Sequence, residues 1–283
     1  MKAGRVHGFG GPDVITVEDI PPPEPAKGQV LVRVRAAGVG PWDAWIRVGR
    51  SVLPQPLPLT LGSDVAGTVE AVGSSDSPFA VGDEIYGVTN TRFTDGYAEY
   101  AAVDEAMIAR KPQRLTHVEA ASVPVVAVTA WQMLFEHAKV ERGQRVLVTG
   151  ASGNVGGYAV QLAENAGVSV LTTAQGSVDA VIDTVGGADQ NSLFDILRPG
   201  GAMVSCVSQP DEALAQQRGL RGVFFLVNVT TGGLETIGGL LDTGKLHTRI
   251  GKVLPLAAAR EAHEMLDGLR PRPGGKIVLK VLA

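Results

Sequence analysis

The chain has 283 residues, which is enough for one large domain or two of ordinary size. Its hydrophobic fraction of 45% and charged fraction of 19% are typical of a folded globular protein. A net charge of −4 gives no electrostatic basis for binding nucleic acid or an anionic membrane, and we expect neither as a partner. The single cysteine, Cys206, excludes an internal disulfide framework and a cysteine-rich zinc site.

The N-terminal residues lack the apolar core of a signal peptide. No apolar run reaches the ~18 residues that indicate a transmembrane helix. We therefore expect a cytoplasmic protein.

The first ~120 residues are rich in glycine and proline, and their strand-forming runs are short. Two such runs are Val30–Val34 and Val65–Val69, and turn signals such as Pro21–Pro23 and Gly82-Asp83 separate them. Short strands with frequent breakers predict a β-barrel-like or irregular β domain.

From about residue 123 the pattern becomes that of an α/β protein. A compact strand at Arg145–Thr149 precedes a glycine-rich turn, and a helix follows from about Val155 to Gly167. Further predicted strands are 168–173, 178–184, 202–207 and 223–229, with helices around 234–241 and 258–269 and a last strand at 276–281. This alternation predicts a parallel sheet with helices on both faces.

The glycine turn spaces Gly150, Gly153 and Gly156 between the strand and the helix. Missing side chains let a pyrophosphate approach the backbone, and the helix N-terminus offers free N–H groups and the positive end of its dipole. The context of strand, turn and helix therefore predicts a dinucleotide site.

The identity of the dinucleotide depends on the strand after the turn. NAD sites usually place an acidic residue at the end of that strand, where it holds the ribose hydroxyls. Here the strand ends in Leu171-Thr172-Thr173-Ala174, without Asp or Glu. This favours NADP(H), because no carboxylate repels a 2′-phosphate.

The link between the strands at 168–173 and 178–184 is too short for a doubly wound sheet. Only Ala174–Ser177 separate them, whereas parallel neighbours need a crossover of about a dozen residues. Four residues could form only a hairpin, which conflicts with a doubly wound sheet. Either the chain has lost a helix–strand unit of roughly 30 residues, or the sequence leaves out a disordered segment. The ordinary flanks favour the second interpretation.

Several motifs occur together along nearly the whole chain. They are Ala36–Asp43 with Ile46–Gly49, Leu61–Gly67, Val81–Asp83, Gly96–Tyr100, Glu119–Pro124, Thr129–Trp131, Val148–Gly156, Asp183–Gly187 and Gly275–Leu279. In this order they resemble the medium-chain dehydrogenase/reductase superfamily, specifically its zinc-free quinone oxidoreductase-like branch.

The resemblance implies a GroES-like β domain, formed by residues 1–122 and 246–283, and a Rossmann domain at 123–245. It implies that nicotinamide and substrate meet between the domains. The implied reaction is hydride transfer from NADPH to a quinone or an activated alkene, and the implied assembly is a homodimer built on Rossmann edge strands.

Departures from the family pattern concern the metal and the nicotinamide contacts. Zinc-dependent relatives have a Cys near Gly40 and a His-Glu pair where this chain has Ser63-Asp64, so we expect no zinc. The zinc-free branch often has Asn at Gly40 and Tyr at Trp45. Trp45 cannot donate a proton as that Tyr would.

Two residues are catalytic candidates. Asp43 would orient substrate or relay a proton, or would be a structural acid that binds nearby N–H groups. Tyr97 would donate a proton to a developing enolate, or would belong to the edge of the core. Trp42 and Trp45 would cover a flat substrate or pack in the domain core.

The predicted cofactor contacts come from the glycine turn, from strand ends and from the resemblance. Thr129 has a helix cap as its alternative role, and Lys276 a solvated terminal cation. The full set is Thr129, Gly150, Ser152, Gly153, Asn154, Val155, Gly156, Thr172, Thr173, Val185, Gly186, Ser208, Phe225, Val227 and Lys276. The five histidines have no ligand spacing, and Cys206 is expected to be inert packing.

The leading hypothesis is an NADPH-dependent quinone or enone reductase that needs no strong acid or base, because its acceptor is already activated. One alternative is a reductase of another small carbonyl compound. The other is a dinucleotide-binding protein without turnover.

Overall fold

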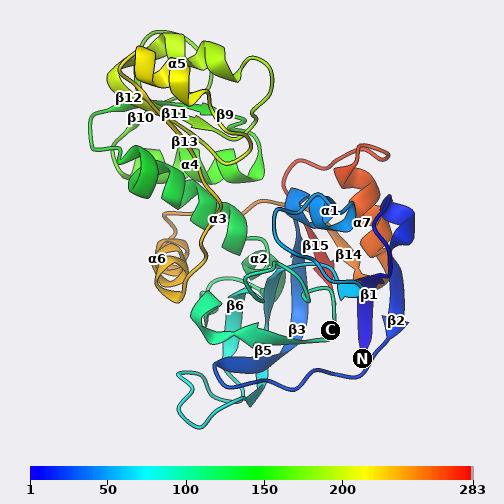
Figure 1. Cartoon of the computed structure of the whole chain (residues 1–283). Coiled ribbons are helices and arrows are strands. Elements are labelled where there is room, and N and C mark those ends of the chain that lie inside the picture. The colour runs from blue at the N-terminus through cyan, green and yellow to red at the C-terminus, as the bar shows by residue number, and fades with distance from the viewer. Residues whose placement is uncertain (282–283) are drawn as a thin grey trace. The chain divides into compact units, whose positions relative to one another are not determined.

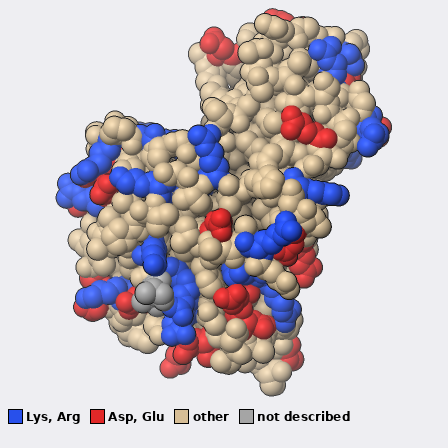
Figure 2. All heavy atoms as spheres, turned by 180° about the vertical axis from the view of Figure 1, so that it is seen from behind, with Lys and Arg blue, Asp and Glu red and all other residues tan. Residues whose placement is uncertain are grey.

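The computed structural model describes residues 1–281, and their contacts divide the chain into two compact units (Figure 1). Unit 1 contains Met1–Val125 and the chain from Val229 onward, and unit 2 contains Val126–Asn228. Among residues 1–281, no helix combines the length and apolar character needed to cross a membrane. On the face drawn in Figure 2, Lys and Arg side chains lie among Asp and Glu side chains.

Unit 1 is built on a seven-stranded sheet and a three-stranded sheet. The larger sheet has the order β14-β15-β3-β5-β6-β8, and β7 also pairs with β3. Its strands are β3 (Gln29–Val39), β5 (Asp64–Val72), β6 (Glu84–Val88), β7 (Tyr100–Asp104), β8 (Ile108–Arg110), β14 (Ile250–Pro255) and β15 (Lys276–Lys280). The smaller sheet pairs β1 (Lys2–Val6) with β2 (Thr16–Asp19) and β4 (Leu59–Thr60).

The long strand β3 shows why this sequence forms a sheet. Val30, Val32 and Val34 are fully buried at every second position, and they pack with β-branched residues of neighbouring strands, such as Val65. Its other end pairs antiparallel with β15, from Val39 opposite Ile277 to Ala36 opposite Lys280. The C-terminal strand β15 therefore belongs to the same sheet as the N-terminal strand β3.

The helices of unit 1 are short. They are α1 (Pro41–Arg47), α2 (His117–Ala120), α6 (Thr231–Asp242) and α7 (Ala259–Leu266), with 3₁₀ turns η1 (Pro12–Val14), η2 (Glu105–Met107) and η5 (Leu256–Ala258).

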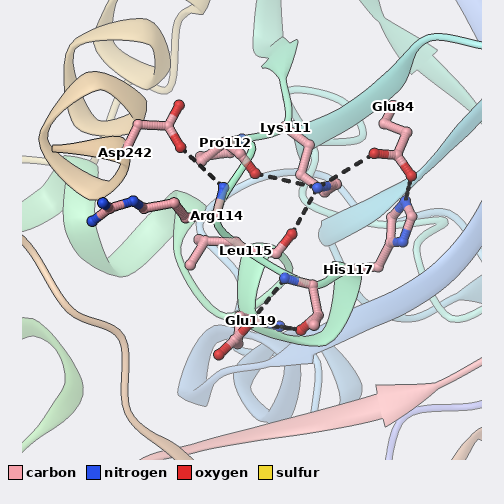
Figure 3. Close-up of polar contacts among 9 residues, drawn as sticks. Glu84, Lys111, Pro112, Arg114, Leu115, His117, Glu119 and Asp242 are labelled. Atoms are coloured by element: carbon pink, nitrogen blue, oxygen red, sulfur yellow. Dashed lines mark hydrogen bonds and ion pairs between the residues drawn. The ribbon is translucent and has the colours of Figure 1, made fainter. Parts of the chain in front are cut away.

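The assignment of α6 to unit 1 differs from the predicted domain boundary at 245/246. The loop after β8 is fixed by Lys111, whose Nζ donates to the carbonyl of Leu115 (2.6 Å) and pairs with Glu84 (3.4 Å) (Figure 3). In that loop the Arg114 N–H donates to Asp242 at the end of α6 (3.1 Å). These contacts attach α6 to the β domain.

Unit 2 contains a five-stranded sheet of order β10-β9-β11-β12-β13, in which every neighbouring pair is parallel. Its strands are β9 (Arg145–Thr149), β10 (Ser169–Leu171), β11 (Val178–Asp183), β12 (Leu197–Ser205) and β13 (Arg221–Phe224). Its helices are η3 (Gln132–Ala138, a π-helix), α4 (Asn154–Asn165), η4 (Gln190–Ile196, a 3₁₀ helix) and α5 (Glu212–Gln217), and α3 (Pro124–Trp131) contains the unit boundary. The parallel α/β prediction is confirmed.

The strand predicted at 223–229 is wrong in its second half. β13 ends at Phe224, and the chain then leaves the sheet. Gln132 takes the place of a strand neighbour there, since its side-chain amide donates to the Asn228 carbonyl and accepts from the Asn228 N–H, both at 3.1 Å.

The short link after residue 173 does not form a hairpin, in agreement with a parallel sheet. β10 and β11 are not neighbours, because each pairs in parallel with one side of β9. β10 stops at Leu171, so residues 172–177 connect the two strands past one end of β9. In the usual order 3-2-1-4-5-6 of such sheets, the strand that is missing among residues 1–281 is the outermost one, and its loss leaves the remaining order intact.

The length of this link can be tested by intact-mass spectrometry of the protein from its natural source. Because the flanks favour an omitted segment, we expect a mass larger than the 29.4 kDa of the 283 residues by roughly 30 residues. A mass of 29.4 kDa would show that the protein has lost the helix–strand unit.

Candidate functional site

The glycine turn in unit 2 is crowded by its own backbone. Gly150 has φ 64°, a left-handed conformation that favours glycine. A Cβ on Gly156 would lie 2.1 Å from the Gly150 carbonyl oxygen, so position 156 has room only for glycine. Gly153 caps α4 with an extended backbone. The first turn of α4 thus follows a turn in which three glycines carry no side chain, and its N–H groups can bind a pyrophosphate.

Asp183 organises the carboxyl ends of three neighbouring strands. Its carboxylate accepts hydrogen bonds from Thr149 at the end of β9 (2.7 Å) and Ser205 at the end of β12 (3.0 Å). It also accepts from the N–H groups of Val185 (3.2 Å) and Gly186 (3.1 Å). Burial raises the pKa of Asp183, but these hydrogen bonds outweigh it and the pKa lies below its usual value.

Sequence reasoning did not assign this role to Asp183. The available signal was an acidic residue at the end of a buried strand followed by Thr184-Val185-Gly186-Gly187. Hydrogen-bonding partners from other strands cannot be identified from that signal alone.

The other cofactor candidates of unit 2 lie in different surroundings. Val185 is 59% exposed, and the Ser208 hydroxyl donates to Gln190 (3.2 Å), whose amide also contacts Asp183 (2.8 Å). Thr172 and Thr173 are exposed after β10, and Ser152 is exposed in the glycine turn.

Three more candidates of the α/β region lie away from the glycine turn in sequence. The Phe225 ring packs on His137 with centroids 4.2 Å apart, and Val227 is half-buried. Thr129 lies inside α3, not at a cap. Burial and Asp183 raise the pKa of Cys206 to about 12, which agrees with an inert thiol.

Asp43 and Tyr97, the two catalytic candidates, are both fully buried in unit 1. Oδ2 of Asp43 accepts hydrogen bonds from the Gly40 N–H (2.8 Å) and the Tyr97 hydroxyl (2.9 Å). Its Oδ1 is buried without a hydrogen-bond partner among the described residues. Burial raises the pKa of Asp43 to about 7, although the Gly40 N–H and Lys276 oppose the shift. Burial and then Asp43 raise the pKa of Tyr97 well above its ordinary value.

A second buried cluster joins Trp42, Ser63, Asp64 and Lys276. The Lys276 ammonium lies 2.9 Å from Oδ2 of Asp64 and 4.4 Å from the centroid of the Trp42 ring. The Trp42 indole N–H donates to the Ser63 hydroxyl (3.0 Å). Lys276 is therefore not a solvated terminal cation, since its side chain is 2% exposed.

Trp42 also occupies the space beside Gly40. A Cβ on Gly40 would lie 2.3 Å from the Trp42 ring, while the φ of −131° suits any residue. The Asn that the zinc-free branch often has at this position therefore has no room here. Trp45, three residues further along α1, is 47% exposed.

Within the part of the chain that the structure describes, no group of three or more His, Cys, Asp or Glu side chains is placed to hold a metal ion.

Comparisons with known proteins agree with this arrangement. Residues 26–113 match the alcohol dehydrogenase GroES-like domain, and residues 159–279 match the zinc-binding dehydrogenase family. The quinone oxidoreductase of Sus scrofa is 31% identical over 99% of this chain and 98% of its own length. That of Homo sapiens is 30% identical over 93% of each, in an alignment of 308 positions. Since 308 exceeds the 283 residues here, the human protein carries residues that this chain lacks.

Solved structures give the same result. The quinone oxidoreductase from Coxiella burnetii has a TM-score of 0.90 at 31% identity and covers 100% of this chain and 99% of its own. A mycobacterial protein solved in complex with NADPH has a TM-score of 0.86 at 26% identity, with 99% of this chain and 100% of its own covered.

The chain therefore belongs to the medium-chain dehydrogenase/reductase superfamily of oxidoreductases. Within that superfamily it groups with the quinone oxidoreductase-like proteins.

Replacing Asp43 with Asn tests the effect of burying this carboxyl. Its pKa is about 4 unfolded and about 7 folded, so its contribution to stability is complete below pH 4 and is lost as the pH rises through 7. Asn resembles the protonated acid and can still accept from Gly40 and Tyr97. We expect the free energy of unfolding of Asp43→Asn, measured in urea, to rise relative to that of the wild type by roughly 1–4 kcal/mol between pH 5.5 and 8.5.

The matched control is Asp19→Asn at an exposed surface pair with Lys2. Asp19 lacks the raised pKa, so we expect no such gain with pH. A pH-independent difference between Asp43→Asn and the wild type would contradict the assignment.

The glycine turn can be tested with two neighbouring positions of α4. A Cβ on Gly156 meets backbone atoms at 2.1 Å, whereas one on Gly157 meets only the Ala151 carbonyl at 3.7 Å. We expect Gly157→Ala to stabilise the protein by roughly 0.5–1 kcal/mol and to leave NADPH affinity unchanged. Gly156→Ala should lower both stability and affinity, as measured by thermal unfolding and titration calorimetry. Equal effects of the two variants would contradict the close packing.

Proposed function

We propose that the protein is an NADPH-dependent, metal-free oxidoreductase that transfers hydride to a quinone or an activated alkene. The observation that carries the proposal is the glycine turn, with its backbone-crowded Gly156 at the start of α4. The relatives named quinone oxidoreductase, which match nearly the full chain, support the acceptor class.

NADPH is favoured over NADH by the residues after β10. Leu171, Thr172 and Thr173 bring no carboxylate to the position where NAD sites usually have one. The mycobacterial structure in complex with NADPH adds support from a relative.

The two units would contribute different parts of the reaction. In unit 2, residues 150–156 would bind the pyrophosphate, and Val185, Gly186 and Ser208 would contact the cofactor beside the Asp183 network. The bound cofactor supplies the hydride. Hydride transfer to an activated acceptor needs only that the protein position the acceptor against the nicotinamide and exclude water, and solvent can deliver the proton.

In unit 1, Trp42 and Trp45 would contact the flat acceptor. We assign Asp43 and Tyr97 as positioning residues, because their hydrogen bonds are directed at Gly40 and at each other and fix the start of α1. Lys276 would act in the same way, through Asp64 and Trp42. We further propose a homodimer formed through the edge strands of the unit 2 sheet, of which β13 is one.

The alternative is a dinucleotide-binding protein without turnover. Two observations favour it: β10 is a three-residue edge strand, and Trp42 fills the place of the Asn that often contacts nicotinamide in the branch.

Steady-state oxidation of NADPH with a panel of quinones and enones tests the proposal. We expect acceptor-dependent oxidation that is faster with NADPH than with NADH and unaffected by chelators. Tight NADPH binding without oxidation by any acceptor would establish the alternative, and activity only with saturated carbonyl compounds would overturn the acceptor class.

A further inference from the structure

A pocket of about 240 Å³ lies between α1 and the end of α7 in unit 1. Pro41, Ala44, Trp45 and Val48 form its apolar wall, and these positions lie on one helical face by their spacing. Opposite them are the end of α7 and the segment that leads to β15. The volume is below the roughly 300–1,000 Å³ of sites for drug-sized molecules, so it suits a ligand of one or two rings.

The charge of this pocket is unusual for a chain of net charge −4. Three arginines and one acid, Asp267, line it. The buried Arg47 donates to Asp267 (2.5 Å) and to the Gly10 carbonyl (3.1 Å), so Asp267 is neutralised within the wall. Among residues 1–281, Arg50 and Arg272 have no hydrogen-bond or ion-pair partner for their side chains, and both are exposed. The pocket thus offers two unpaired guanidinium groups.

Trp45 supplies the other recognition element. A tryptophan that is 47% exposed beside an apolar helix face offers a broad surface on which a planar ring can stack. Guanidinium groups bind carboxylates and sulfonates through planar, paired hydrogen bonds. An aromatic ring with an anionic substituent satisfies both elements.

We propose that this pocket binds a planar aromatic anion, with the ring on Trp45 and a carboxylate or sulfonate between Arg50 and Arg272. Because Trp45 is also the predicted substrate contact, the occupant is the hydride acceptor itself, and in this respect the inference rests on the proposed function. The acceptors would then be quinones or enones that carry an acidic group.

Binding is tested by titration calorimetry on the NADPH-loaded protein with 2-naphthoate and with 2-naphthalenemethanol, its uncharged counterpart. We expect naphthoate to bind about tenfold more tightly. The double variant Arg50→Gln/Arg272→Gln should remove this preference, and Trp45→Ala should weaken both ligands alike. The matched control is Arg114→Gln, an exposed arginine of the loop after β8, which should leave both affinities unchanged.

Equal binding of the two ligands, full naphthoate affinity in the double variant, or no naphthoate binding at millimolar concentration would each overturn the inference. Its failure is separable from that of the proposed function. If quinone reduction persists with the same KM for sulfonated and unsubstituted naphthoquinone, only the anion site is refuted. If naphthoate binds in an arginine-dependent manner but no acceptor oxidises NADPH, the anion site stands, whereas the proposed function and the assignment of the occupant as hydride acceptor are refuted.

Discussion

The buried ion pair of Lys276 and Asp64 is the contact on which the organisation of unit 1 depends. It joins β15, from the end of the chain, to β5 of the N-terminal sheet at a separation of 212 residues. Two charges taken out of water cost several kcal/mol each unless they are paired and further satisfied. The Val125 N–H on Asp64 (3.1 Å) and the Trp42 ring on Lys276 provide that satisfaction.

The ion pair also determines what the start of α1 can do. Because the Trp42 ring lies over the ammonium, it occupies the space next to Gly40 and excludes a side chain there. Asp43 holds the start of α1 by hydrogen bonds with the Gly40 N–H and the Tyr97 hydroxyl. Arg47 connects the end of α1 to His263 by a hydrogen bond of 3.0 Å. Trp45 instead lines the pocket between α1 and the end of α7, and its side chain is 47% exposed. In α1, Asp43 and Arg47 thus contact buried polar partners, whereas Trp45 lines the pocket.

Local features of the fold were predictable from the sequence. The bounds of β9, the start of α4 and its end at Gly167, which has φ 76°, follow from residues within a few positions of each other. The glycine turn was predictable for the same reason, since Gly150 and Gly156 crowd one another across six residues. Which strands pair with one another, by contrast, depends on residues far apart in the sequence. The sequence alone did not show that β9 lies between β10 and β11, which follow one another along the chain.

Side-chain networks were hidden for the same reason. Asp183 takes partners from β9 and β12, and Lys276 takes one from β5, so neither environment is encoded near the residue itself. Trp42 and Trp45 look equivalent in the sequence, but the Trp42 ring packs on Lys276 whereas the Trp45 side chain is 47% exposed. Composition and motif order identified the class of protein, whereas these environments required the tertiary structure.

The three-residue strand β10 lies at the edge of the unit 2 sheet. A change at an edge exposes one row of backbone groups and disturbs no interior pairing. β9 keeps a partner on each side, and the glycine turn at its end keeps its geometry. The hydrogen bonds that keep β9 in place therefore do not depend on the strand order beyond β10.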